Sequence, residues 1–171
     1  MRRLIILGAG GFGKVVADIA QQSGAYPEIV FLDDSSQGYK VIGECQDYKQ
    51  FADGETEMYP AFGKNELRLE WITRLQQEQI SVATLIHKSA YVSPRTEIGI
   101  GSVVMPGAVV NTNTKVGQGC IVNCNAVIDH DCVLEDGVHI CLNATVKAQN
   151  RIAKETKIEA GTVIENSVYP L

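Results

Sequence analysis

The sequence predicts a chain of two parts, an α/β unit over residues 1–79 and a parallel β-helix over residues 80–171. Three observations lead to this prediction. The first 79 residues alternate between strand-like and helix-like segments. From residue 80 onward, valine, isoleucine or leucine returns at every sixth position. The composition, with 45% hydrophobic and 20% charged residues in a chain of 171, is that of a packed globular protein.

The first part has the βαβαβ pattern of half a dinucleotide-binding fold. Short aliphatic runs predict strands, and apolar residues at helical spacing predict the helices between them. The expected strands are Arg3–Leu7, Glu28–Leu32 and Met58–Phe62, with a small strand or turn over Tyr39–Gly43. The expected helices are Lys14–Ser23, stopped by Gly24, and a second helix capped by Asn65. Alternating strands and helices imply a small parallel sheet.

The second part repeats with a period of six residues. Fifteen positions in phase are aliphatic: Ile80, Ile86, Val92, Ile98, Val104, Val110, Val116, Val122, Ile128, Leu134, Ile140, Val146, Ile152, Ile158 and Ile164. Neither a helix nor a plain strand has this period. A hexapeptide period is the signature of a parallel β-helix, with three hexapeptides in each coil. The aliphatic side chains are expected to point inward and to stack between coils about 4.8 Å apart.

Two further positions of the repeat carry information. The residue four positions after each aliphatic is mostly small, as a tight corner requires: Ala90, Thr96, Ser102, Ala108, Thr114, Cys120, Ala126, Cys132, Ala144, Thr156 and Thr162. The residue before each aliphatic is expected on the outer face, and eight of these are apolar: Leu85, Tyr91, Val103, Val109, Ile121, Val127, Val133 and Val163. An exposed apolar stripe of this kind usually marks a subunit interface, so a homo-oligomer with cyclic symmetry is expected.

Charge and composition exclude several functions. A net charge of −5 argues against a nucleic-acid partner, because phosphate binding needs a basic face. No apolar run approaches the ~18 residues that span a bilayer, and Leu4–Leu7 is too short for a signal peptide. No membrane insertion is therefore expected.

Five cysteines, without a CxxC pair, favour free thiols and a cytoplasmic location. A metal site around His130 is an alternative, because four cysteines lie near it in sequence: Cys120, Cys124, Cys132 and Cys141. The corner positions of Cys120 and Cys132 explain these two residues without a metal, and no metal is expected.

A glycine motif lies between the first strand and the first helix. Gly8, Gly10 and Gly13 form GxGxxG, and an acidic residue, Asp33, follows the next strand. This pattern is the fingerprint of NAD binding, in which backbone N–H groups and a helix N-terminus receive a diphosphate. Only half of a dinucleotide fold precedes the repeat, which favours one nucleotide over two. A purely structural tight turn and an NAD site both stay open as alternatives.

Several segments together resemble the nucleotide-sugar acetyltransferases with a left-handed β-helix, which act as sialic-acid-type O-acyltransferases or as N-acetyltransferases of UDP- or dTDP-linked 4-amino-6-deoxy sugars. The matching segments are Gly8–Val16, Phe31–Asp34, Phe62–Arg68, Leu85–Ala90 and Asn125–Cys132. No single motif is specific, but their order and spacing are. The resemblance implies a left-handed β-helix, acetyl-CoA as co-substrate, and a cytoplasmic homotrimer with three active sites, each between neighbouring β-helices.

The resemblance also assigns roles to the N-terminal residues. The diphosphate of a nucleotide sugar is expected on Gly10, Gly11, Phe12 and Gly13, next to Gly8. Asp33 and Asp34 can accept hydrogen bonds from the base N3–H or the ribose hydroxyls, and Gly63, Lys64 and Asn65 form a second turn facing the same crevice. Many relatives have histidine where this chain has Phe12, so one polar contact to the substrate is expected to be missing.

Histidines in the repeat are the candidates for catalysis. His130 lies two residues after an inward aliphatic and is expected to face outward as the base that deprotonates the sugar amine, oriented by Asp131. The resemblance places His139 near the thioester carbonyl and Ala148, where relatives have glycine, near the pantetheine of acetyl-CoA. The predicted reaction is direct transfer to the amine without an acyl-enzyme. O-acetylation and a non-catalytic, sugar-nucleotide-binding trimer are the alternatives.

Overall fold

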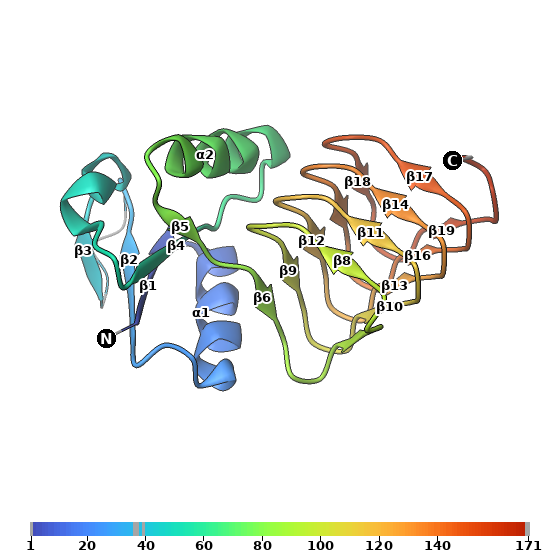
Figure 1. Cartoon of the computed structure of the whole chain (residues 1–171), viewed down its shortest axis with the longest axis horizontal. Coiled ribbons are helices and arrows are strands. Elements are labelled where there is room, and N and C mark those ends of the chain that lie inside the picture. Colours follow the sequence, from blue (N-terminus) through green and yellow to red (C-terminus); the bar gives the residue numbers. More distant parts are fainter. Residues whose placement is uncertain (1, 36–37, 39, 170–171) are drawn as a thin grey trace. The chain divides into compact units, whose positions relative to one another are not determined.

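A computed structural model describes residues 2–35, 38 and 40–169 of the chain. It divides into two compact units, residues 1–85 and residues 86–171, each of which has its own core (Figure 1). The division falls six residues after the expected one, because residues 81 and 82 form a strand of the first unit's sheet. Ile80, the first position of the sixfold pattern, packs in that unit's core and not in the β-helix.

The first unit is built on a five-stranded parallel sheet. Its strands are β1 (Arg3–Leu7), β2 (Glu28–Leu32), β3 (Val41–Gly43), β4 (Thr56–Pro60) and β5 (Ser81–Val82), in the order β3-β2-β1-β4-β5. The chain moves outward from β1 in one direction and then returns to β4 on its other side. Ligands of such sheets bind at this change of direction, outside the carboxyl ends of the strands. The glycine motif follows β1 at that place.

Helices cover both faces of this sheet. On one face, α2 (Asn65–Gln77) and the 3₁₀ helix η1 (Cys45–Phe51) pack Trp71, Leu75 and Tyr48 against the strands. On the other face, α1 (Gly11–Ser23) approaches Ile6 and ends at Gly24, whose φ of 70° suits glycine. The βαβαβ prediction is confirmed. Two details were wrong: the third strand ends two residues earlier than expected, and η1 was not anticipated.

The second unit is a parallel β-helix of two-residue strands that recur every six residues (Figure 1). The strands are β6 (Leu85–Ile86), β7 (Tyr91–Val92), β8 (Glu97–Ile98), β9 (Val103–Val104), β10 (Val109–Val110), β11 (Lys115–Val116), β12 (Ile121–Val122), β13 (Val127–Ile128), β14 (Val133–Leu134), β15 (His139–Ile140), β16 (Thr145–Val146), β17 (Arg151–Ile152), β18 (Lys157–Ile158) and β19 (Val163–Ile164). They form three sheets, β18-β15-β12-β9-β6, β19-β16-β13-β10-β7 and β17-β14-β11-β8. Each strand therefore pairs with the one 18 residues away.

The core of the β-helix is the predicted aliphatic stack. Ile128, for example, is fully buried and lies in register with Val110 on one side and Val146 on the other. The small residues at the corners are buried as well, and several of them also donate a hydrogen bond. Ser102 donates to the carbonyl of Gly117 at 2.8 Å, and Thr114 donates to the carbonyl of Asp129 at 2.8 Å. These bonds link each corner to the next coil.

The outer face differs from the expectation in one sheet. Leu85, Val103 and Ile121 are almost completely buried within the chain, so they cannot contribute to an exposed stripe. The apolar residues that do reach the surface line the sheet β19-β16-β13-β10-β7. Tyr91 and Val163 are 55% and 51% exposed at its two ends, with the half-buried Val109 and Val127 between them.

Within the part of the chain that the structure describes, no helix is both long enough and apolar enough to cross a membrane. Each of the five cysteines is a free thiol. Over the same described residues, no group of three or more histidine, cysteine or acidic side chains is arranged to hold a metal ion.

Candidate active site

The turn that follows β13 carries His130, and the preceding coil holds this turn in place. Thr114 donates to the carbonyl of Asp129, and the backbone N–H of Asp131 donates to the carbonyl of Thr112 at 3.1 Å. Asp131 has a φ of 56°, which makes the chain turn sharply into β14. The backbone at His130 is therefore fixed from the coil before it.

Two side chains of this turn form a pair. Nδ1 of His130 lies 2.6 Å from Oδ2 of Asp131, and the two side chains are 49% and 40% exposed. Because a carboxylate only accepts, the imidazole keeps its proton on Nδ1 and Nε2 carries the lone pair. The hydrogen bond to Asp131, assisted by the negative charges of Asp129 and Asp131, raises the pKa of His130 above its ordinary value. The pair thus presents a basic nitrogen at the surface of the β-helix.

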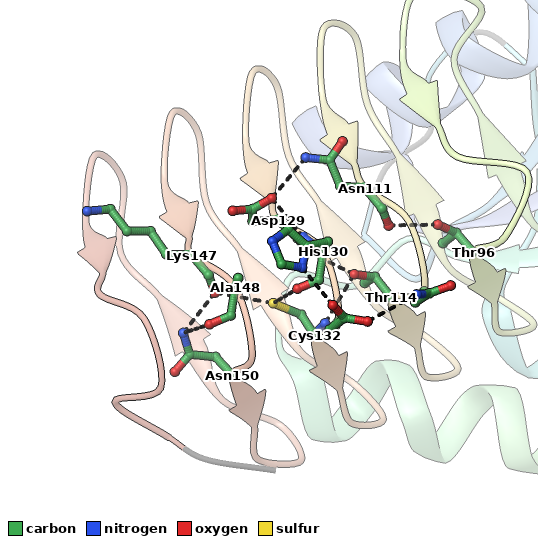
Figure 2. A network of polar contacts seen from close by, with 11 residues as sticks. Thr96, Asn111, Thr114, Asp129, His130, Cys132, Lys147, Ala148 and Asn150 are labelled. Atoms are coloured by element: carbon green, nitrogen blue, oxygen red, sulfur yellow. Dashed lines mark hydrogen bonds and ion pairs between the residues drawn. The ribbon is translucent and has the colours of Figure 1, made fainter.

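A neighbouring acidic residue also contributes to this turn. Asp129 Oδ1 accepts from the backbone N–H of His130 at 2.8 Å and from Nδ2 of Asn111 at 3.1 Å (Figure 2). Sequence reasoning did not identify Asn111. The signal that could have found it is the 18-residue coil, because Asn111 and Asp129 occupy the same position in consecutive coils.

The structure places His139 and Ala148 differently with respect to His130. His139 lies on β15, in the sheet β18-β15-β12-β9-β6, where Nδ2 of Asn123 donates to its Nε2 at 3.2 Å. It therefore belongs to a different face from the turn after β13. Ala148 lies 18 residues after His130, on the next coil (Figure 2), and is 5% exposed. A methyl group is thus the side chain that follows His130 in the stack.

The glycine motif forms a tight turn with an open side. A Cβ on Gly13 would lie 1.9 Å from the carbonyl oxygen of Gly8, and Gly8 itself has a φ of 104°, so both positions require glycine. In contrast, a Cβ on Gly10 or Gly11 would meet nothing within 4 Å. Gly10 is the N-cap of α1, and no side chain of the described residues caps it. The first N–H groups of α1 can therefore receive an anion.

Phe12 and Asp33 support this turn. The ring of Phe12 packs edge-on against Tyr59, with the ring centroids 6.4 Å apart. Asp33 Oδ2 accepts from the backbone N–H of Ala9 at 2.6 Å, and Asp33 Oδ1 accepts from the N–H of Ser35 at 2.9 Å. Asp33 therefore holds the glycine turn to the end of β2.

An acidic cavity of about 440 Å³ lies beside the end of β2. Its lining includes four carboxylates, those of Asp33, Asp34, Glu44 and Asp47. Asp34 Oδ1 accepts from the backbone N–H of Cys45 at 2.7 Å, which ties η1 to the same loop. The cavity is lined by hydrogen-bond acceptors, as a site for base or ribose donors requires.

The second turn, after β4, is arranged differently from the expectation. Lys64, not Asn65, is the N-cap of α2, and both Gly63 and Lys64 are exposed. Asn65 is buried, and its Oδ1 accepts from Nη2 of Arg68 at 2.8 Å. Lys64 is therefore the residue of this turn that is available to an anionic ligand.

Comparisons with known proteins agree with this geometry. Residues 3–75 match the model of the PglD N-terminal domain. The structure resembles the acetyltransferase domain of PglB from Neisseria gonorrhoeae, with a TM-score of 0.92 and 39% identity over 95% of this chain and 82% of that one. It also resembles PerB from Caulobacter crescentus, solved with CoA and GDP-perosamine, with a TM-score of 0.79 and 27% identity over 100% of this chain and 92% of that one.

An α/β unit with a glycine turn, joined to a hexapeptide β-helix with an exposed histidine–carboxylate pair, defines a sugar-modifying acyltransferase. The chain belongs to the family of nucleotide-sugar acetyltransferases with a left-handed β-helix, of which the PglB domain is a relative. The expected fold class and family are thereby confirmed.

Proposed function

We propose that this acetyltransferase moves the acetyl group of acetyl-CoA to the amine of a UDP- or dTDP-linked 4-amino-6-deoxy sugar. The observation that carries the proposal is the His130–Asp131 pair, with Nδ1 protonated by geometry and Nε2 facing outward. The relatives support the substrate class. The PglB domain has been solved with acetyl coenzyme A, and PerB with CoA and GDP-perosamine.

His130 acts as the general base in this proposal. The sugar amine attacks the thioester carbonyl, so that an N–C bond forms and the C–S bond breaks. Nε2 of His130 takes the proton that the nitrogen loses, and Asp131 stabilises the resulting imidazolium through Nδ1. The thiolate of CoA then receives a proton, and no acyl-enzyme forms. His139 is proposed to contact the thioester carbonyl, and Ala148 to leave space for the pantetheine.

The N-terminal unit holds the nucleotide in the same proposal. The open N–H groups at Gly10, Gly11 and Phe12 receive the diphosphate, and Lys64 adds a positive charge from the second turn. Asp34 accepts hydrogen bonds from the base or the ribose.

Transfer assays with purified protein test the proposal directly. Acetyl-CoA is offered with UDP-, dTDP- and GDP-linked 4-amino-6-deoxy sugars, and release of the CoA thiol and formation of the N-acetyl product are followed. His130→Gln is expected to lower kcat by roughly 10²- to 10⁴-fold, the usual contribution of a general base. Full activity of His130→Gln contradicts the assignment of the base. Transfer to a hydroxyl, or to the GDP-linked sugar alone, contradicts the proposed acceptor, and no transfer at all favours the non-catalytic alternative.

A homotrimer is part of the proposal, as is a cytoplasmic location. The apolar stripe of Tyr91, Val109, Val127 and Val163 covers one sheet of the β-helix, and His130 follows Val127 on the same coil. Burial of the stripe against another copy would bring a second chain to His130. Val127→Asp is expected to reduce the mass measured by light scattering, whereas Val133→Asp, on a different sheet, is the matched control. An unchanged mass for Val127→Asp contradicts this interface.

A further inference from the structure

Both oxygens of the Asp131 carboxylate are held by side chains. Oδ2 accepts from His130 at 2.6 Å, and Oδ1 accepts from Nδ2 of Asn113 at 3.1 Å. Asn113 lies 18 residues before Asp131, and therefore occupies the same position in the preceding coil. It is thus attached to the pair from below, and not through the turn that carries His130.

The second hydrogen bond matters because the pair is exposed. An exposed ion pair contributes little when its side chains are free to move. The terminal torsion of aspartate is broad, so a carboxylate held through one oxygen can rotate away from its partner. Hydrogen bonds to the two oxygens from two different coils oppose this rotation.

The backbone explains why an asparagine can do this. Asn113 and Asp131 have φ angles of 59° and 56°, in the left-handed region that asparagine and aspartate tolerate better than other side chains. Two residues with the same backbone conformation in consecutive coils direct their side chains alike. A short amide at residue 113 therefore meets the carboxylate of the coil above it.

We propose that Asn113 is a positioning residue for catalysis: it fixes the Asp131 carboxylate, so that His130 keeps its proton on Nδ1 and presents Nε2 to the substrate. This inference rests on the proposed function for its catalytic consequence. Its structural part, the effect of Asn113 on the imidazole, does not. The amide of Asn113 also helps to hold the pKa of Asp131 below its ordinary value, after the larger contribution of the hydrogen bond with His130.

Other ionisable groups near His130 are few within the described residues. Asp129 lies on the same turn and raises the pKa of His130. Lys147, on the next coil, is paired with Glu165, and the Cys132 thiol is buried, which raises its pKa. Residues 111–113 of the preceding coil are neutral. A substitution that introduces charge at residue 113 therefore acts on the pair without displacing an existing ion pair.

Two variants test the proposal with opposite expected signs. Asn113→Gly keeps the left-handed backbone and removes the amide, so the Asp131 carboxylate is released and the pKa of His130 is expected to fall. Asn113→Asp keeps the size of the side chain and adds a negative charge, so the pKa of His130 is expected to rise. The chain has three histidines, and NMR titration of their imidazole signals reports each pKa, with the His130 signals assigned by their loss in His130→Gln.

Kinetics supply the second readout. Asn113→Gly is expected to lower kcat roughly 3- to 10-fold with little change in the KM of the sugar nucleotide, as for loss of one partly exposed hydrogen bond. Asn143→Gly is the matched control, because Asn143 is exposed and has a φ of 56° but does not bond to the pair. It is expected to leave both readouts unchanged.

The outcomes separate this inference from the proposed function. Opposite pKa shifts in a protein without transferase activity support the positioning of His130 and contradict the proposed reaction. Unchanged His130 titration in both variants, in a protein whose acetyl transfer depends on His130, overturns the role of Asn113. Equal losses of kcat in Asn113→Gly and Asn143→Gly, without a pKa shift in either, also overturn it.

Discussion

Substitutions in the glycine turn should separate its structural role from its binding role. In Gly13→Ala, the new Cβ would lie 1.9 Å from the carbonyl oxygen of Gly8, although contacts between carbon and its neighbours normally begin near ~3.5 Å. The backbone of β1 or α1 must move to accept it. Overpacking of this kind typically costs about 1–3 kcal/mol. For a chain of this size, that corresponds to a fall in Tm of roughly 2–12 °C.

Gly11→Ala provides the contrast within the same turn. Its Cβ meets nothing within 4 Å, and alanine favours a helix by about 0.5–1 kcal/mol over glycine, so the stability is expected to stay equal or to rise. The methyl group would, however, occupy the space above the first N–H groups of α1. If a diphosphate binds there, affinity for the nucleotide should fall by about tenfold or more.

Calorimetry measures both effects on the same preparations. Thermal scans compare the stability of the two variants with that of the parent chain, and titration with UDP, dTDP and GDP compares their affinities. A parental Tm for Gly13→Ala would show that the close approach to Gly8 does not exist. Parental nucleotide affinity in a stable Gly11→Ala would place the diphosphate elsewhere and remove the basis for this binding site.

Three further predictions follow from the β-helix. Asp131→Asn removes the main cause of the raised pKa of His130; because a general base must be unprotonated, the acid limb of kcat/KM should move to lower pH while its plateau falls, and an unmoved limb would contradict the pairing. Ile128→Ala should destabilise the β-helix by about 2–5 kcal/mol in urea denaturation, whereas the half-buried Val127→Ala on the same strand should cost less. Ala148→Val should raise the KM for acetyl-CoA several-fold with little change in the KM of the sugar nucleotide; equal changes in both would indicate general misfolding.

The β-helix could be predicted from sequence because one physical requirement is repeated in every coil. A narrow prism accepts one aliphatic side chain at each sixth residue, so errors at single positions do not obscure the period. Ile80 shows the limit of this reasoning, since it keeps the phase of the repeat but packs beside β5. The burial of Val103 and Ile121 shows another limit, because the local pattern states which side chains leave the prism but not what covers them.

The N-terminal site was predictable as a motif but not in its detail. The spacing of Gly8 and Gly13 follows from steric contact and is readable from sequence. The bond from the backbone of Ala9 to Asp33 is a long-range contact whose geometry depends on the ends of two strands. Asn65 looked like a helix cap because its residue type suits that role, but the bond that Arg68 donates to it draws its side chain away.

The site on the β-helix occupies a middle position between these two cases, and the coil length is the reason. His130 and Asp131 are adjacent, so their pairing needs no knowledge of the fold. Their supporting residue Asn113, and the small Ala148 beyond them, are distant in sequence but lie 18 residues before Asp131 and 18 residues after His130. Once three hexapeptides are known to make one coil, subtracting or adding 18 gives the side chains that stack below and above any residue. A solenoid therefore converts long-range contacts into a fixed sequence offset, and its active-site neighbours can be searched by arithmetic where those of the α/β unit cannot.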